Sequence, residues 1–388
     1  MLTVEQQFAP TLCLTHNCNL SCAYCYQKHS IGQRMPLDIA KNAINWIFEN
    51  VPNYVDEVVI DFIGGEPLLE FNLIKDIVLY VKKKRPNIPY IFYVNTNGTV
   101  LTSEMKQWFL KYKNIVQLGL SLDGRKDTHD YNRSNSFDSI DIDFFIQNYP
   151  EQGIKMTLSE YSLHHLANDI IYFHSLGINE IGGVNLAEST FKNSFDWNND
   201  KYITLLIKQF KTLVDFYVEN DKLKLCALFN KKLEICESTN KERIKWCGVG
   251  VDMPFFDVDG KIYPCSYITP MTFEQNELND ILQTNFYDDE LFIDDECFNN
   301  CYIYPICSTC AGVNYMTNKL FKKRNKNKCR IQKLIALFIA DLQGKRLVKS
   351  GGLFGSIKDD TKLYYTIEAI KKIKSLYLDE FKNFNIIE

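Results

Sequence analysis

Three cysteines near the start of the chain have the spacing of a metal-cluster ligand set. Cys18, Cys22 and Cys25 form a Cx3Cx2C pattern within eight residues. Thiolates are soft ligands that bind iron–sulfur clusters or zinc. A four-iron cluster held by these thiolates keeps one iron without a protein ligand nearby, and that iron can bind a reactive cofactor. The alternative is a zinc site whose fourth ligand comes from elsewhere in the chain.

Three polar loops downstream offer groups that can bind such a cofactor. Each directly follows a short apolar run, and the loops are Gly64–Pro67, Asn95–Gly98 and Ser121–Gly124. The glycines of the first loop let backbone groups approach a ligand, and Glu66 can accept hydrogen bonds from an ammonium group. Taken alone, this loop is equally compatible with a plain strand-to-helix turn.

The cysteine triplet and the Gly-Gly-Glu-Pro loop together resemble the radical S-adenosylmethionine (radical SAM) enzymes. The resemblance implies a [4Fe–4S] cluster on Cys18, Cys22 and Cys25, with S-adenosylmethionine bound at its open iron and cleaved reductively to a 5′-deoxyadenosyl radical. It also implies a set of cofactor-binding residues. These are Gly64, Gly65, Glu66 and Pro67 at the amino group, Ser121 and Asp123 at the carboxylate and ribose, Asn95 on the neighbouring loop, and Tyr24 against the adenine.

The run His129–Arg133 also resembles the family's segment after its fourth strand. By that resemblance Arg133 pairs with the carboxylate of the cofactor, and a surface arginine is the alternative. The residues that follow, Ser134–Asp138, lack the glycine-rich continuation common in relatives.

A second group of cysteines occupies residues 247–329, and its order resembles the SPASM domain. This extension of some radical SAM enzymes carries two auxiliary [4Fe–4S] clusters, so the resemblance implies three clusters in all. A zinc ribbon is the alternative. By the family pattern, the first auxiliary cluster is held by Cys247, Cys265 and Cys310, and the second by Cys297, Cys301, Cys307 and Cys329.

Two positions depart from the sulfatase-maturing members of this family. Met253 stands where those relatives place an eighth cysteine, so the first auxiliary cluster is expected to keep an open iron or to gain Asp252 or Asp257 as a ligand. Ser266 stands where they place an aspartate that serves as the base. A serine hydroxyl is a poor general base at neutral pH, so sulfatase activation is disfavoured and the catalytic base stays unknown.

Before the second cysteine group, short apolar runs alternate with amphipathic stretches. Six strand–helix repeats predict an α/β fold with a parallel sheet and right-handed crossovers. By the resemblance this is a partial (β/α)6 TIM-like barrel, in which chemistry occurs at the carboxyl ends of the strands. The predicted strands cover residues 9–15, 57–63, 89–95, 115–121, 154–159 and 181–186, with helices for example at 36–50 and 73–84.

We expect four parts along the chain. They are a radical SAM core (9–190), a helical bridge (191–246), a small cysteine-rich SPASM domain (247–330), and a helical C-terminal extension (331–388) broken by a loop at 350–356.

Composition excludes several other classes of protein. The formal net charge of −4 indicates no general nucleic-acid partner. The longest apolar stretch is too short for a membrane span, and the first residues do not form a signal peptide. Thirteen cysteines, most of them clustered, indicate metal ligation in the reducing cytoplasm.

These features predict a radical SAM/SPASM enzyme that modifies a ribosomally made precursor peptide by an oxidative crosslink or other oxidation. Sulfatase-maturase-like oxidation of a protein side chain, oxidation of a small molecule, and a non-catalytic multi-cluster electron carrier are the alternatives. We expect a reductant such as flavodoxin or ferredoxin. The run Lys319–Lys333, with eight Lys or Arg residues and no acid, is either a solvated surface or a docking site for that reductant or an acidic leader peptide. The predicted first strand begins at about residue 9, so a separate leader-recognition protein is a further possible partner.

Overall fold

The computed structural model describes residues 7–27, 32–187, 196–237, 245–350 and 361–384, and the chain divides into two compact units. The first contains residues up to Leu122 together with His129–Ile154 and Gly248–Asp288. The second contains Asp123–Thr128, Lys155–Cys247 and Asp289 onward.

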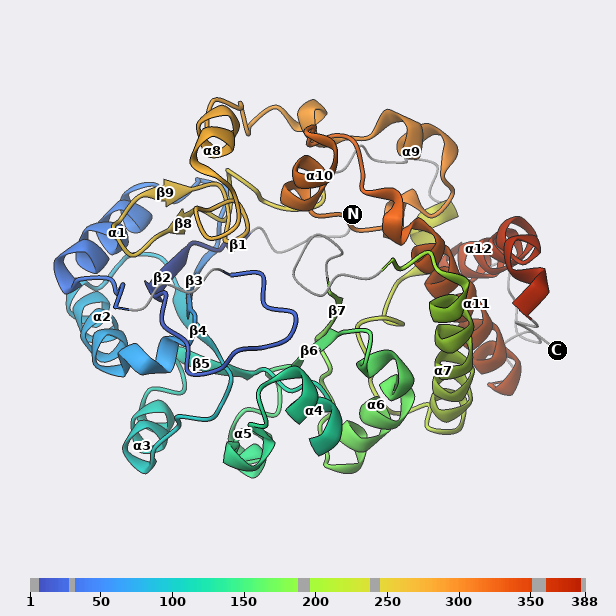
Figure 1. Ribbon diagram of the computed structural model, residues 1–388, viewed down its shortest axis with the longest axis horizontal. Helices are drawn as coiled ribbons and strands as arrows, with labels where there is room; N and C mark the ends of the chain where they lie inside the picture. The colour runs from blue at the N-terminus through green and yellow to red at the C-terminus, as the bar shows by residue number, and fades with distance from the viewer. Residues whose placement is uncertain (1–6, 28–31, 188–195, 238–244, 351–360, 385–388) are drawn as a thin grey trace. The chain divides into compact units, whose positions relative to one another are not determined.

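A parallel sheet forms the centre of the first unit (Figure 1). Its strands run in the order β5-β4-β3-β2, continued by β8 and then by antiparallel β9, while β1 pairs with β3. Since sequential parallel strands are neighbours here, their carboxyl ends meet at one edge of the sheet. The strands are β1 (Gln7–Phe8), β2 (Thr11–Thr15), β3 (Glu57–Gly64), β4 (Tyr90–Thr96), β5 (Val116–Leu120), β8 (Phe255–Phe256) and β9 (Ile262–Tyr263).

Helices between these strands bury one apolar face each. Helix α1 buries Ala40, Ala43, Ile44 and Ile47, which recur at the three- and four-residue spacing of one helix face. The helices of this unit are α1 (Leu37–Glu49), α2 (Phe71–Lys84), α3 (Ser103–Lys111), α5 (Ile142–Asn148) and α8 (Gln275–Ile281), and α4 (Lys126–Asn132) begins in the second unit and ends in the first.

The second unit combines a two-stranded parallel sheet with a set of helices. Strand β6 (Lys155–Leu158) pairs with β7 (Gly183–Leu186). Helix α11 packs against both α7 and α12, and its residues Leu334–Leu342 are all buried. The helices are α6 (Leu166–Ser175), α7 (Asp200–Glu219), α9 (Asp295–Asn300), α10 (Ala311–Asn318), α11 (Cys329–Lys349) and α12 (Thr361–Tyr377).

The predicted α/β class with a parallel sheet is confirmed, and each of the six predicted strands is found. The helical C-terminal region is confirmed by α11 and α12, whereas residues 351–356 of its predicted loop lie outside the described residues. The domain boundaries stay a prediction. None of the helices in the described part of the chain has the length and apolar character needed to cross a membrane.

The described part of the predicted helical bridge (191–246) is helical only in α7 and in the short 3-10 helix Leu233–Glu237, and residues 191–195 lie outside the described residues. Helix α7 ends at Glu219, where the Asn220 side chain donates to the carbonyl oxygen of Phe216. The irregular segment that follows buries Cys226 and Phe229, because tertiary packing rather than helical periodicity places these apolar side chains. Residues 238–244 of the predicted bridge lie outside the described residues.

Candidate cofactor and cluster sites

The cysteine loop lies directly against the glycines at the end of β3. The amide of Gly65 donates to the carbonyl oxygen of Thr15 at 2.9 Å, and the amide of Glu66 donates to that of Asn17 at 2.9 Å. A Cβ atom at Gly65 would lie 2.2 Å from the Asn17 oxygen and 2.8 Å from the Cys18 Cβ. The glycine is therefore required because the cysteine loop packs against it. This requirement is additional to the predicted role of the glycines in letting a ligand approach the backbone.

Glu66 is a buried carboxylate held by three neutral donors. Its side chain is 1% exposed and accepts hydrogen bonds from Thr96 Oγ1 at 2.6 Å, the Asn97 amide at 2.8 Å and the Leu68 amide at 3.1 Å. Burial raises the pKa of Glu66, and these hydrogen bonds oppose the rise. A carboxylate has about four acceptor positions, so one remains for a further donor, and a cationic donor would offset the cost of burying the charge.

The next two strand ends meet through Asn95 and Ser121. Asn95 Nδ2 donates to Ser121 Oγ at 3.1 Å, and the Ser121 amide donates to the carbonyl oxygen of Thr96 at 2.9 Å. The Oδ1 atom of Asn95 is buried and has no hydrogen-bond partner among the described residues. A buried acceptor of this kind fits a ligand hydroxyl such as that of a ribose.

Arg133 brings a positive charge to the same edge. The residue is 8% exposed, and its guanidinium lies 5.5 Å from the ring centroid of Tyr24. Burial raises the pKa of both Cys18 and Cys25, and Arg133 lowers it, which favours the thiolate form. Arg133 is therefore a buried arginine near the cysteine loop, and the surface alternative does not apply.

In the second unit, four cysteines lie close enough for their thiols to affect one another. Burial raises the pKa of Cys329, and the thiols of Cys307 and Cys301 raise it further. Burial and the carboxylate of Asp294 raise the pKa of Cys297 to about 12, and the Cys329 and Cys301 thiols act in the same direction. Thiols that resist ionisation in this way become thiolates when a cationic metal cluster binds them. The four are the residues predicted to hold the second auxiliary cluster.

Arg324 lies beside this quartet and comes from the basic run. Its Nη1 donates to the carbonyl oxygen of Cys307 at 2.8 Å, and its guanidinium lies 4.4 Å from the ring centroid of Tyr304. It lowers the pKa of Cys297 and Cys307 against the larger effect of burial. Part of the basic run is thus buried structure, since Arg324 is 6% exposed.

The comparisons with known proteins agree with this arrangement. Residues 12–146 match the family model of the radical SAM superfamily. The chain therefore contains a radical SAM domain. The matched segment contains β2 to β5, the cysteine loop and all three polar loops.

Two relatives and one solved structure extend the likeness of this radical SAM enzyme beyond that segment. A cysteine-type anaerobic sulfatase-maturating enzyme of Clostridium novyi (strain NT) is 24% identical over 318 residues, or 75% of this chain and 84% of that protein. The radical SAM cyclopropyl synthase TigE of Paramaledivibacter caminithermalis is 25% identical over 363 residues, or 86% of this chain and 74% of that protein. The structure of anSMEcpe with bound AdoMet and Cp18Cys peptide has a TM-score of 0.67 at 19% identity, covers 89% of this chain and 99% of that chain, and shows the same fold.

Asp123 of this radical SAM enzyme belongs to the second unit, unlike the other predicted cofactor-binding residues. Its side chain is fully buried, and Oδ1 accepts a hydrogen bond from the Thr157 amide of β6 at 2.9 Å. The carboxylate therefore holds β6 in place, and its predicted contact with the cofactor stays a prediction.

The three cysteines predicted for the first auxiliary cluster are divided between the units. Cys265 follows β9 in the first unit, whereas Cys247 and Cys310 belong to the second. The two carboxylates considered as additional ligands have protein partners, since Tyr54 donates to Asp252 Oδ1 at 2.6 Å and His16 Nε2 lies 2.6 Å from Asp257 Oδ1. The ligand set of this radical SAM enzyme's first auxiliary cluster stays a prediction.

Sequence reasoning missed a buried group just before the cysteine loop. His16 bridges Asp257 and Gln33, with 2.6 Å from Nε2 to Asp257 Oδ1 and 2.6 Å from Nδ1 to Gln33 Oε1. The Sγ atom of Cys13 is close by, within 4.8 Å of a ring nitrogen of His16 and of a carboxylate oxygen of Asp257. The direct hydrogen bond leaves no space for an ion between His16 and Asp257. The group instead ties the end of β2 to the segment after β8, and the only sequence signal was the His16 position two residues before Cys18.

Cys236 is a second residue to which sequence reasoning assigned no role. Burial lowers the pKa of the Lys231 ammonium, and the thiols of Cys307 and Cys236 both oppose this. Lys231 also donates to the carbonyl oxygen of Ile306 at 2.9 Å. Cys236 therefore lies in the neighbourhood of the cysteine quartet, a proximity that no local sequence pattern indicates.

Proposed function

We propose that this radical SAM enzyme matures a peptide, forming an oxidative crosslink or a related modification in a ribosomally made precursor. The observation that carries the proposal is the meeting of Glu66, Asn95 and Ser121 at one sheet edge with the cysteine loop and Arg133. This edge supplies an acceptor for an ammonium group, an acceptor for a hydroxyl and a buried cation. Those are the complements of the amino group, ribose and carboxylate of S-adenosylmethionine.

In this proposal each residue has a binding or positioning task. Cys18, Cys22 and Cys25 hold the first [4Fe–4S] cluster, and Gly64-Gly65 keeps the cysteine loop against β3. Bound S-adenosylmethionine and this cluster supply a 5′-deoxyadenosyl radical that removes a hydrogen atom from a substrate carbon. The cofactor-binding set is Tyr24, Gly64, Gly65, Glu66, Pro67, Asn95, Ser121, Asp123 and Arg133.

We further propose three clusters, of which the two auxiliary ones would supply an acceptor for the electron that the substrate radical loses on oxidation. The second auxiliary cluster is assigned to Cys297, Cys301, Cys307 and Cys329, and the mutual pKa effects of these thiols support that assignment. The first is assigned to Cys247, Cys265 and Cys310. Flavodoxin or ferredoxin is the proposed reductant. The cytoplasm is the proposed location, because a reducing compartment keeps these cysteines available to clusters.

The names of the relatives support a peptide or protein substrate and an oxidative outcome. One relative is named a sulfatase-maturating enzyme, another a cyclopropyl synthase, and the matching structure contains a peptide together with AdoMet. Ser266 in place of an aspartate argues against the sulfatase version. We therefore favour formation of a new bond within a precursor peptide.

The test is anaerobic turnover by the reconstituted full-length enzyme. We expect it to bind S-adenosylmethionine and, with dithionite, to release 5′-deoxyadenosine. A precursor peptide encoded beside the gene is expected to lose two hydrogen atoms, which mass spectrometry of the product measures. An enzyme that binds no S-adenosylmethionine would be an electron carrier instead, and oxidation of a sulfatase-derived peptide but not of the neighbouring peptide would favour the sulfatase-maturating alternative.

A further inference from the structure

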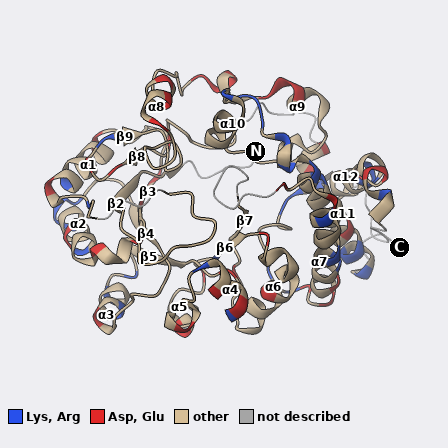
Figure 2. Ribbon diagram, in the orientation of Figure 1, with Lys and Arg blue, Asp and Glu red and all other residues tan. Residues whose placement is uncertain are grey.

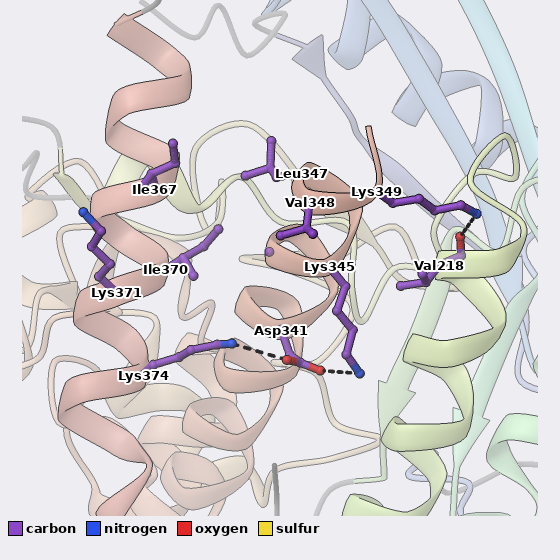
Figure 3. Close-up of a pocket in the computed structure, with 11 residues that line it drawn as sticks. Val218, Asp341, Lys345, Leu347, Val348, Lys349, Ile367, Ile370, Lys371 and Lys374 are labelled. Carbon is purple, nitrogen blue, oxygen red and sulfur yellow. Dashed lines mark hydrogen bonds and ion pairs between the residues drawn. The ribbon is translucent and has the colours of Figure 1, made fainter. Parts of the chain in front are cut away.

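A pocket of about 590 Å³ lies between the last turns of α7 and α11 and the middle of α12 (Figure 3). Its wall is apolar and is made by Val218, Leu347, Val348, Ile367 and Ile370. Val348 is 65% exposed. The volume is within the range of ligand-binding pockets, and no residue assigned to the cofactor or the clusters lines it.

Lysines stand on two walls of this pocket at helical spacing. Lys345 and Lys349 are four residues apart on α11, and Lys371 and Lys374 are three residues apart on α12. Each pair therefore lies along one face of its helix. Figure 3 shows the two pairs on different helices, and Figure 2 shows that Lys and Arg recur along α11. The lining thus presents two basic rows beside an apolar floor.

Among the described lining residues, the one carboxylate is already engaged. Asp341 is 7% exposed and lies 3.0 Å from Lys345 Nζ and 3.3 Å from Lys374 Nζ. Lys349 donates to the carbonyl oxygen of Val218 at 2.7 Å, a contact that does not neutralise its charge. Lys371 contacts Glu368 at 2.8 Å, and Lys345 also contacts Asp215 at 3.4 Å, so some of the charge is shared with carboxylates outside the lining. Among the described residues, the four lining lysines outnumber Asp341, Asp215 and Glu368 together, so a net positive charge remains.

We propose that this pocket binds an acidic amphipathic helix in the leader part of the precursor peptide. The inference rests on the proposed function, because it names the partner segment that function requires. An amphipathic helix places apolar anchors in a groove between helices and carries charges on both flanks. Two basic rows match acidic side chains on both flanks, whereas a fatty acid has one carboxylate and would use one row. Charge complementarity therefore favours the peptide.

The experiment measures binding of fluorescein-labelled peptides of about four helical turns to the full-length reconstituted enzyme by fluorescence anisotropy. The first peptide places Leu at three- and four-residue spacing and Glu elsewhere. The second has the same composition in scrambled order, and the third has Lys in place of Glu. The variants are Val348→Glu, which puts a carboxylate in the pocket, and Leu376→Glu as the matched control, because Leu376 is 49% exposed on α12 and lies outside the lining.

We expect the acidic amphipathic peptide to bind at least about tenfold more tightly than either other peptide. Val348→Glu should weaken it by about tenfold and Leu376→Glu by less than about twofold. Equal binding of the scrambled peptide, or no effect of Val348→Glu, would overturn the proposal. Three other outcomes would also overturn it. Displacement of the peptide by micromolar oleate would identify a fatty acid as the occupant, and a dimer that dissociates on Val348→Glu would identify a second copy. Binding that emerges only after Leu353 and Phe354 are changed to Ser would identify the chain itself.

Release of 5′-deoxyadenosine is measured in parallel and separates this inference from the proposed function. Both variants are expected to cleave S-adenosylmethionine at the wild-type rate without peptide. If the wild-type enzyme binds the acidic helix but cleaves no cofactor, the proposed function fails while the pocket assignment stands. If cleavage occurs and the helix does not bind, only the pocket assignment fails.

Discussion

Thr96 Oγ1 donates a 2.6 Å hydrogen bond to the buried carboxylate of Glu66, which joins the loops after β3 and β4. This bond, together with the one from the Asn97 amide, holds the carboxylate at the edge where the cysteine loop also lies. A charged acceptor is thereby fixed before any ligand arrives, which reduces the entropy lost on binding.

Glu66→Gln should weaken binding of S-adenosylmethionine. The substitution removes the charge and replaces one acceptor oxygen by an NH2 donor that faces the donor of Thr96 or Asn97, and losing a hydrogen bond to a charged group costs about 1.5–3 kcal/mol. We expect a loss of roughly tenfold or more in affinity, measured by anaerobic isothermal titration. Glu70→Gln, one helical turn along the chain, is the matched control and should bind normally. Unchanged affinity of the Glu66 variant would contradict the assigned contact.

Replacing Cys18, Cys22 and Cys25 by alanine should abolish release of 5′-deoxyadenosine. If three four-iron clusters are present, iron should fall from about twelve to about eight atoms per chain. Iron analysis and mass spectrometry of the nucleoside measure the two effects. Cys226→Ala, a buried thiol outside both cysteine groups, should keep full iron and turnover. Turnover in the triple variant would refute the assigned role of the triplet.

Gly65→Ala should displace the cysteine loop. The new Cβ would lie 2.2 Å from the Asn17 oxygen, and relief requires a backbone shift that costs about 1–3 kcal/mol. We expect loss of the iron of the first cluster, with the auxiliary clusters retained, measured by Mössbauer or electron paramagnetic resonance spectroscopy. Gly183→Ala serves as control, because its nearest neighbours would lie at 3.5 Å. A fully loaded Gly65 variant would disprove the packing argument.

Asp257→Ala should destabilise the first unit. It removes the carboxylate that lies 2.6 Å from the buried Nε2 of His16, and losing that partner costs about 1–3 kcal/mol. Asp257→Asn keeps an acceptor at the same place and should recover part of the loss, as followed by chemical denaturation. Asp259→Ala, in the neighbouring turn, is the control. If the alanine and asparagine variants are equally stable, the hydrogen bond to His16 contributes little.

Acidification should weaken the second unit through His174. Burial lowers the pKa of His174 below 6.5, and its Nε2 lies 3.0 Å from the hydroxyl oxygen of Tyr217. The folded state therefore favours the neutral ring, so its stabilising effect is complete above pH 6.5 and is lost as the pH falls through the lowered pKa. Urea midpoints compared between pH 7.5 and 5.5 should fall more for the wild type than for His174→Gln. Equal slopes would show that His174 is not responsible.

Much of the local structure follows from the sequence. The six predicted strands coincide with β2 to β7, because alternating apolar runs and helical periodicity are short-range signals. The Gly-Gly-Glu-Pro loop and the cysteine triplet indicate the family for the same reason, since their spacing is local. The extent of the bridge after α7 was not predictable in this way, because Cys226 and Phe229 are buried where the chain folds back against α7.

The sequence by itself therefore indicated most of the secondary structure elements and the family, and it predicts which cysteines hold the clusters. Only the tertiary structure decided which groups meet. It buried Arg133 beside Tyr24, paired His16 with Asp257 across 241 positions, and placed the four cysteines of the second unit near one another. The physical reason is that local patterns fix backbone conformation, whereas burial and hydrogen bonding between distant segments depend on how the finished elements pack.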